Sequence, residues 1–159
     1  MIYTSYFDNL GALPSNLIPV SICGKAPEWY EKWPKGLQYK KLAPKYGFFM
    51  KWKENRDNDY YISCYKEQVL NNLNPETVIK ELEELCGDLL QDNKSICLLC
   101  YEQPQEFCHR HLVSAWLKEN GHPCQEWEMI CEEDICIVPT QLDVDDLLRK
   151  ISEIDRSED

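Results

Sequence analysis

The change of hydrophobic pattern along residues 96–117 constrains the fold more than any other feature of the chain. Ile96 to Tyr101 is a short apolar run of strand length, Gln103 to Gln105 carries a proline typical of a loop, and Phe107 to Leu117 has apolar residues at helical spacing. A buried strand followed at once by a helix is the building unit of α/β sheets. The sequence therefore predicts a strand over 96–101 and a helix over 107–119.

The rest of the chain alternates in the same way. Strands are expected at 2–7 and 17–23, which are rich in aromatic and β-branched residues. Helices are expected over 59–73 and from Pro75 onward, because Asn74 is a suitable N-cap and proline suits the first helical position. Residues 24–56 show little period and are predicted to form a long loop with short helical pieces. The predicted fold class is α/β, with a mainly parallel sheet and helices packed on it.

Length and composition narrow the class of protein. The chain has 159 residues, enough for one domain with its own core. No apolar run approaches the roughly 18 residues of a membrane span, and the first residues lack the basic region and long apolar stretch of a signal peptide. We therefore expect a cytoplasmic protein with no membrane partner and with reduced cysteines. Cys23, Cys64 and Cys97 are interpreted as small buried hydrophobic residues.

The net charge of −11 is unevenly distributed. Residues 132–159 carry ten acidic and three basic side chains, and are predicted to form a strand and an acidic amphipathic helix over 142–154. Residues 25–56 instead carry nine basic and three acidic side chains, with eight aromatic residues among them. Basic groups attract phosphates and aromatic faces stack on bases. Residues 25–56 are interpreted either as a nucleotide or nucleic-acid surface, or as a solvated face whose aromatic residues close over the core.

Reactive side chains gather at the predicted strand–helix junction. Cys100 and Glu102 share one face of the strand, because side chains alternate along it, and Cys108 and His109 lie at the start of the helix. A thiol at a helix N-terminus beside a cationic group has a lowered pKa and is nucleophilic, and a carboxylate can act as acid or base. These four residues are the predicted catalytic set.

A second set is predicted to bind the substrate. Arg110 can hold an anionic group through two parallel hydrogen bonds, and the free N–H groups of the helix start also suit an anion. Lys25, Trp29 and Tyr39 are drawn from the basic and aromatic residues 25–56. The prediction is that Arg110 and Lys25 converge on one cleft with the catalytic set.

Each of these assignments has a structural alternative. Cys108 could be an inert core thiol, His109 could bond the last carbonyls of the strand, and Arg110 could form a salt bridge with Glu102. A zinc site from Cys100, Cys108 and His109 would need a fourth ligand or water that no standard spacing supplies, so no metal is predicted and the cofactor stays open. Cys97-x-x-Cys100 is disfavoured as a metal or redox pair, because its two side chains point to opposite faces of a strand.

The same residues carry a resemblance. The LLCYE strand, the FCHRHLVSAWL helix and the upstream YTSYF and PVSI strands resemble the domain-of-unknown-function 488 family, whose members include YeaO-like proteins. The hallmark is a strand ending in Cys-x-Glu, here Cys100 and Glu102, followed by a Cys-His-Arg helix start, here Cys108 to Arg110. The resemblance implies a compact Rossmann-like α/β domain over residues 1–131, with residues 132–159 as an acidic C-terminal segment that has no counterpart in the family.

The resemblance has one departure and implies no reaction. Many relatives place Asp-x-Arg after the second strand, whereas residues 21–25 read SICGK here, so that Lys25 stands in for the arginine. Two functions stay open: an enzyme that uses a thiol and a histidine on a nucleotide or nucleic-acid substrate, or a non-catalytic module. That module would bind a nucleotide or small anion, or its acidic surface would engage a basic or nucleic-acid-binding partner.

Overall fold

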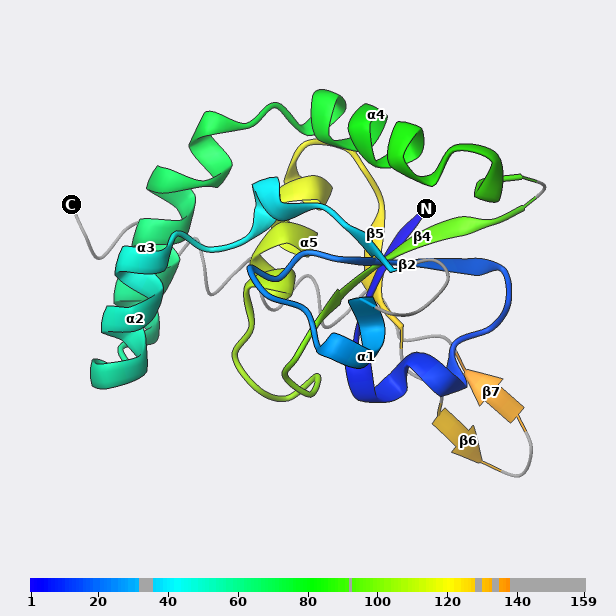
Figure 1. Ribbon diagram of the computed structural model, residues 1–159, viewed down its shortest axis with the longest axis horizontal. Helices are drawn as coiled ribbons and strands as arrows, with labels where there is room; N and C mark the ends of the chain where they lie inside the picture. The colour runs from blue at the N-terminus through cyan, green and yellow to red at the C-terminus, as the bar shows by residue number, and fades with distance from the viewer. Residues whose placement is uncertain (32–35, 92, 128–129, 133–134, 138–159) are drawn as a thin grey trace.

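A five-stranded parallel sheet forms the centre of the molecule (Figure 1). The computed structural model describes residues 1–31, 36–91, 93–127, 130–132 and 135–137. The strand order is β3-β2-β4-β1-β5, and every pairing in this sheet is parallel. The predicted α/β class is therefore confirmed. The sheet strands are β1 (Ile2–Tyr6), β2 (Leu17–Ser21), β3 (Leu37–Gln38), β4 (Ser95–Cys100) and β5 (Cys124–Glu126).

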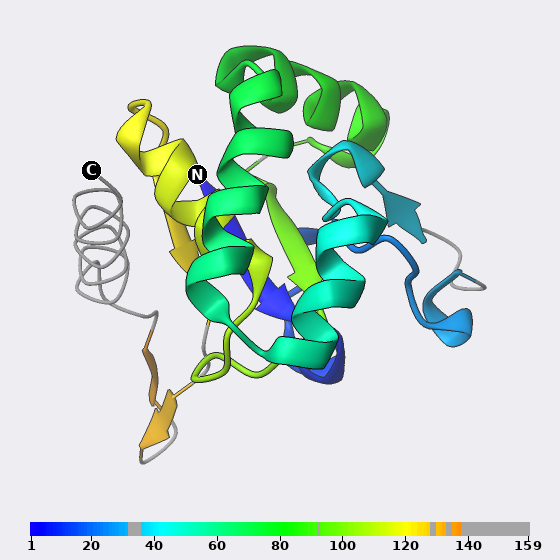
Figure 2. The same cartoon turned by 90° about the vertical axis from the view of Figure 1, so that its left-hand side faces the viewer.

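Helices cover both faces of the sheet. They are α1 (Glu28–Glu31), α2 (Tyr46–Asn55), α3 (Asn58–Gln68), α4 (Pro75–Cys86) and α5 (His109–Glu119), with short 3₁₀ helices at Phe7–Ala12, Lys40–Leu42, Leu70–Asn72 and Gly87–Leu89. Figure 1 shows α4 above the strands and α1 below them, and Figure 2 turns the molecule so that α2 and α3 stand side by side in front. The chain therefore makes the layered packing expected of an α/β domain.

The central strand β4 explains why both faces are covered. Five of its six residues are buried, because a strand in the middle of a parallel sheet has helices on both sides. Leu98 packs into a cluster with residues of α2 to α5, and Leu99 packs on the opposite face with Phe7 and Tyr30. This alternation places Cys97 on the Leu99 face, as the sequence predicted.

Local signals set most helix ends. Asn74 accepts a hydrogen bond from the backbone N–H of Thr77, and Pro75 opens α4, as predicted. Gly87 ends α4 with a φ of +51°, a conformation that suits glycine. α5 begins at His109 and not at 107, because Cys108 is its extended N-cap residue. The predicted helix over 59–73 divides into α3 and a 3₁₀ turn at Leu70–Asn72.

Residues 24–56 are more regular than the sequence predicted. They contain α1, the short edge strand β3 and the ten-residue helix α2. The sequence of α2 has only a weak helical pattern, and aromatic contacts with α3 stabilise the helix. The Phe48 ring lies 5.2 Å from the Tyr61 ring, and the Trp52 ring lies 5.4 Å from the same Tyr61 ring. Tertiary packing of this kind overrides local propensity.

The C-terminal part is described only as far as a hairpin. Strands β6 (Ile130–Glu132) and β7 (Ile135–Ile137) pair antiparallel in a separate sheet. The predicted helix over 142–154, and most of the acidic segment 132–159, lie outside the described residues. Within the described part of the chain, no helix is long and apolar enough to cross a membrane, and Cys23, Cys64, Cys86, Cys97, Cys100, Cys108 and Cys124 are free thiols.

Candidate functional site

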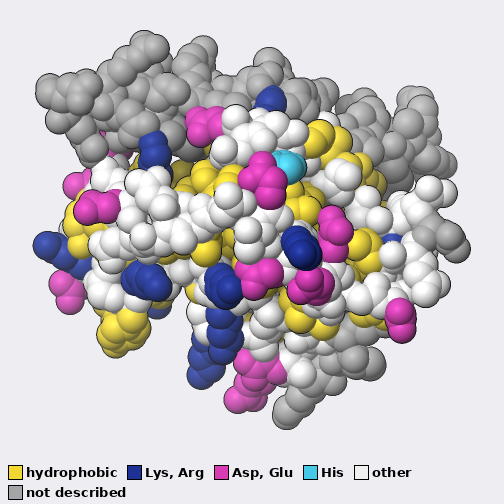
Figure 3. All heavy atoms as spheres, turned by 90° about the horizontal axis from the view of Figure 1, so that it is seen from above, with side chains coloured by type: hydrophobic (Ala, Val, Ile, Leu, Met, Phe, Trp, Pro, Cys, Tyr) yellow, Lys and Arg dark blue, Asp and Glu magenta, His cyan; other side chains and the backbone are white. Residues whose placement is uncertain are grey.

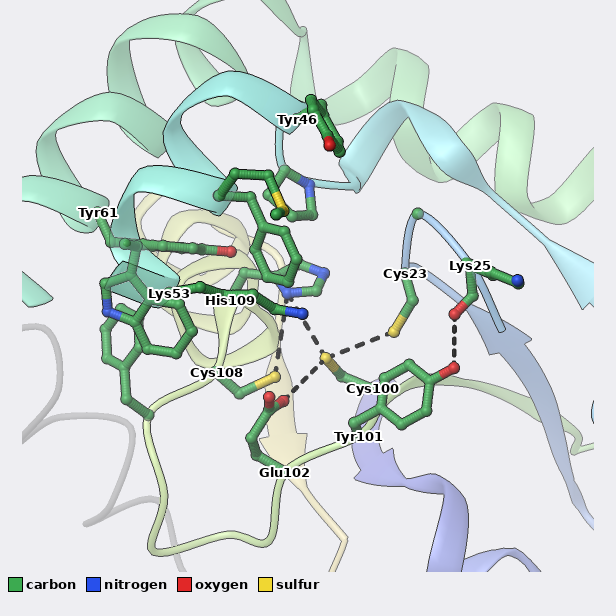
Figure 4. A pocket seen from close by; sticks show the side chains of 16 residues that line it. Cys23, Lys25, Tyr46, Lys53, Tyr61, Cys100, Tyr101, Glu102, Cys108 and His109 are labelled. Atoms are coloured by element: carbon green, nitrogen blue, oxygen red, sulfur yellow. Dashed lines mark hydrogen bonds between the residues drawn. The ribbon is translucent and has the colours of Figure 1, made fainter. Parts of the chain in front are cut away.

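A pocket of about 760 Å³ lies at the carboxyl edge of β2 and β4. This edge is where parallel α/β sheets usually bind their ligands. Figure 4 shows the pocket with its thiols on the floor and helix α2 forming the opposite wall. The lining residues are Cys23, Gly24, Lys25, Pro44, Tyr46, Phe49, Met50, Trp52, Lys53, Tyr61, Cys100, Tyr101, Glu102, Phe107, Cys108 and His109.

The sheet topology brings three thiols and one imidazole together. β2 and β4 are neighbours and parallel, so Cys23, just after β2, lies beside Cys100, the last residue of β4. The Cys100 Sγ lies 3.5 Å from the Cys23 Sγ, 3.5 Å from the His109 Nδ1 and 3.4 Å from a carboxylate oxygen of Glu102. The Cys108 Sγ lies 4.0 Å from the same His109 nitrogen. Cys100 is therefore the centre of the cluster.

One hydrogen bond determines the role of the histidine. The Nε2 of His109 lies 2.8 Å from the carbonyl oxygen of Ile22, and only a protonated nitrogen can donate to a carbonyl. In the neutral ring, Nδ1 is then the unprotonated nitrogen, and it faces Cys100 and Cys108. His109 is thus oriented to accept a proton from a thiol.

Burial controls the electrostatics of the cluster. Burial raises the pKa of both Cys100 and Cys108 well above the ordinary value of a thiol. The sequence predicted a lowered pKa for Cys108; the direction is opposite because the start of α5 is covered by the domain. For His109, burial opposes the imidazolium, but contact with Cys108 raises the pKa overall. Burial therefore favours the protonated form of both thiols, and the His109 Nδ1 is the proton acceptor beside them.

The walls of the pocket are aromatic and its rim is cationic. Tyr61, Phe107 and Trp52 pack against one another, with the Phe107 ring 5.0 Å from that of Tyr61 and 5.7 Å from that of Trp52. Lys25 lies on the β2 side and Lys53 on α2 (Figure 4). Flat apolar walls with a few charged groups are typical of small-molecule sites.

The comparisons with known proteins identify the family of the chain. A family model described as the active DUF488-N3 subclade matches residues 8–121. The chain belongs to the DUF488 family. No curated protein and no solved structure matches it.

The Cys-His-Arg motif of the DUF488 family is divided between two environments. Arg110 is fully buried outside the pocket, and its Nε and Nη2 donate to the Glu126 carboxylate at 3.0 Å and 2.8 Å. Thr4 donates to the same carboxylate at 2.6 Å. Arg110 was expected to face the cleft with His109, or to pair with the Glu102 carboxylate. Its ionic partner is Glu126, and Glu102 contributes its backbone carbonyl to Nη1 at 2.5 Å.

The predicted substrate-binding residues are also divided. Lys25 lines the pocket, and Figure 4 shows its ammonium group directed away from Cys23 and Cys100. Trp29 is half exposed and its ring packs against Phe7, while the buried Tyr39 donates to Glu81. Neither of these two is among the residues that line the pocket. Both follow the alternative interpretation of residues 25–56, in which aromatic residues pack against the domain.

Among the pocket residues that the sequence did not assign to the site, Cys23, Lys53 and Tyr61 contribute a thiol, a cationic group and an aromatic wall. Cys23 was interpreted as a small buried hydrophobe, but its thiol contacts Cys100. Its position at the end of a predicted strand was the available signal, since neighbouring parallel strands end at the same edge. Lys53 and Tyr61 reach the pocket from α2 and α3. No local pattern could place them there, because their position depends on how these helices pack on the sheet.

Two groups of described residues have the atoms to hold a metal ion. Cys23, Cys100 and His109 form one, and Cys100, Glu102 and Cys108 form the other, each with its ligand atoms within 4.8 Å of one another. Both groups use Cys100, so one ion would engage one group or the other. Sulfur and imidazole ligands suit zinc, and the bond from His109 to a backbone carbonyl is a usual support for such a ligand.

Proposed function

We propose that this pocket is the active site of an enzyme in which the Cys100 thiol is the nucleophile and His109 is its proton acceptor. The observation that carries the proposal is the 3.5 Å contact between the Cys100 Sγ and the His109 Nδ1, with the other ring nitrogen held by the Ile22 carbonyl. A nucleophile beside a base that a third group orients is the general arrangement of covalent catalysis.

The neighbouring groups have complementary roles. The Glu102 carboxylate, 3.4 Å from the Cys100 Sγ, accepts a hydrogen bond from the thiol at rest and is placed to exchange a proton with a leaving group. Cys108 contacts the same face of His109 and tunes the basicity of the imidazole. Arg110 holds the loop that carries Glu102 through its backbone carbonyl, so it positions the site and does not touch the substrate.

The substrate class that best fits the walls is a nucleotide. An aromatic base can stack among the rings of Trp52, Tyr61 and Phe107, and Lys25 and Lys53 can meet a phosphate. The volume of about 760 Å³ is within the range of small-molecule pockets. Figure 3 shows acidic and basic side chains interspersed on the face seen from above. Among the described residues of that face, charges of both signs alternate and form no continuous basic surface for a duplex, which favours a single nucleotide or an exposed base.

A binding module without chemistry is the second candidate. The raised pKa of both Cys100 and Cys108 favours it, because a buried, protonated thiol is a poor nucleophile. The two candidates share the pocket and the ligand class. They differ in whether the Cys100 thiol, with the His109 Nδ1 beside it, is chemically reactive.

Alkylation with iodoacetamide distinguishes the two candidates. Burial raises the pKa of both Cys100 and Cys86, a thiol of α4 whose pKa is raised to about 11 and which serves as the matched control. We expect Cys100 to label faster than Cys86, because only Cys100 is proposed to pass its proton to an adjacent histidine. A panel of nucleotides should protect Cys100 and raise the melting temperature; a ligand at 100 times its Kd stabilises by about 2.7 kcal/mol. If nucleotides protect Cys100, but Cys100 and Cys86 label equally slowly in their absence, the protein is a binding module. No nucleotide effect in either measurement contradicts the nucleotide class.

A further inference from the structure

Of the three thiols in the site, the Cys23 thiol is the one that the proposed mechanism does not use. We propose that Cys23 and Cys100 form a dithiol–disulfide redox pair, in which Cys23 resolves a mixed disulfide formed on Cys100 by a small-molecule disulfide. The proposal rests on the proposed function only in taking Cys100 as the nucleophile. It requires no nucleotide.

The positions of the two sulfurs support a direct bond. The Cys23 Sγ and Cys100 Sγ are 3.5 Å apart and both side chains are buried. A disulfide needs about 2.0 Å between the sulfurs, so the gap closes by a small side-chain rotation. The N–H of Ile22 bonds to the Leu99 carbonyl at 3.1 Å, which continues the pairing of the two chain segments up to the cysteines. The backbone is therefore already held at the separation of paired strands.

Cys23 is better placed than Cys108 to resolve an adduct on Cys100. The Cys108 thiol contacts His109, and its backbone is fixed as the N-cap of α5. Cys23 instead follows the end of β2 and precedes Gly24. A Cβ atom added at Gly24 would meet no other atom within 4 Å, so there is open space beside Cys23. The Cys23 side chain can therefore rotate its sulfur toward Cys100 while α5 stays in place.

The chemistry balances with one named co-reactant. His109 Nδ1 takes the proton of Cys100, and the thiolate attacks a disulfide RSSR to give Cys100–S–SR and RS⁻. The Cys23 thiol then loses its proton to solvent, and the resulting thiolate attacks the Cys100 sulfur and expels a second RS⁻. The products are the Cys23–Cys100 disulfide and two thiols, RSH, so two protein thiols are oxidised and one disulfide is reduced. A reducing thiol reverses both steps by the same exchange.

Oxidised glutathione tests the pair in the full chain without nucleotide. The reduced protein is treated with it, free thiols are alkylated, and peptides are mapped by mass spectrometry without reduction. We expect a Cys23–Cys100 linked peptide that disappears with dithiothreitol, while Cys86 stays alkylatable after unfolding. A stable glutathione adduct on Cys100 of the wild-type protein, or a link between Cys100 and Cys108, overturns the assignment of Cys23.

Substitution of Cys23 separates a resolving role from a structural one. Cys23→Ser should fold, as shown by an unchanged circular dichroism spectrum, and should accumulate the glutathione adduct on Cys100 at least tenfold over wild type. Cys64→Ser, at a partly exposed position on α3, is the control and should resolve the adduct like wild type. Should Cys23→Ser fail to fold, the linked peptide of the wild-type protein still decides the question.

Two results distinguish this proposal from the proposed function. If the disulfide forms but no nucleotide binds, the redox pair stands and the nucleotide class is wrong. If nucleotide protects Cys100 but no link forms, the redox pair is wrong and the active site stands. A further result overturns both uses of the thiols: the purified protein holds one zinc ion per chain, and Cys23 and Cys100 do not react. The two residues would then be metal ligands.

Discussion

The two neighbours His109 and Arg110 lie in opposite kinds of environment. His109 faces a pocket with three thiols and a carboxylate, whereas Arg110 is enclosed with Glu126 and Thr4 behind the start of α5. Successive residues of a helix point about 100° apart, so a contiguous Cys-His-Arg motif serves two sides of the molecule. Under the proposed function the thiol side carries the chemistry, while the arginine side holds the helix and the Glu102 loop in position.

The largest effect is expected from removing the arginine. Arg110→Ala leaves the Glu126 carboxylate buried without its cation, and breaking a buried pair from one side costs about 3–5 kcal/mol. Urea denaturation of the free protein measures the loss. Lys41→Ala removes an ion pair on the surface and is the control, with an expected change of about 0–1 kcal/mol.

A double substitution sharpens that test. Arg110→Met with Glu126→Leu replaces both charges by apolar side chains and should recover most of the lost stability, because neither partner is left unpaired. A free protein that keeps its stability in Arg110→Ala but no longer binds nucleotide would place Arg110 at the ligand after all.

The side of the molecule that holds Arg110 should also lose stability as the pH falls. Burial and the nearby Arg110 charge lower the pKa of His111 to about 4. The unfolded chain then binds a proton more readily than the folded one below pH 6.5, so stability present at neutral pH is lost as the pH falls toward 4. A loss of about 2 kcal/mol at pH 5 is expected from a shift of this size. The loss of stability between pH 7 and pH 5 should be smaller in His111→Gln than in the wild type, as measured by urea denaturation at both pH values. Equal losses in the two proteins would contradict the lowered pKa of His111.

The sequence predicted the order of elements well because strong local patterns encode it. The apolar run of β4 and the Asn74–Pro75 start of α4 identify themselves within a few residues. Cys100, Glu102, Cys108 and His109 were likewise placed together, since strand alternation and the helix start fix their directions. Cys23 and Lys53 could not be placed, because a single sequence does not state which strand neighbours β4 or where α2 packs. Arg110 was placed on the wrong side, because its partner Glu126 lies on β5, and a single sequence does not state that this strand pairs with β1.

The pH dependence of labelling examines the thiol side. Burial raises the pKa of Cys100, so only a small fraction is thiolate at neutral pH in the absence of a ligand. The rate of alkylation should rise about tenfold per pH unit from pH 7 and continue to rise above pH 8.5, where an ordinary cysteine levels off. Stopped labelling with mass spectrometry measures the profile. A plateau below pH 8 would indicate a lowered pKa and a permanently activated nucleophile.

The smallest effect concerns the cationic rim of the pocket. Lys53 lines the pocket with its Nζ 4.9 Å from the centre of the Phe49 ring, whereas Lys51, on the same helix, lies over Tyr60 and is not among the lining residues. Lys53→Ala removes one contact to a phosphate in a partly solvated position, a change worth about 1 kcal/mol or less. We expect nucleotide monophosphate binding to weaken up to about fivefold while binding of the matching nucleoside is unchanged, both measured by calorimetry. Lys51→Ala has the same change in net charge and should leave both affinities as they are. Equal weakening by the two substitutions would mean that the general field of α2 attracts the ligand, and that no lysine of the rim meets the phosphate.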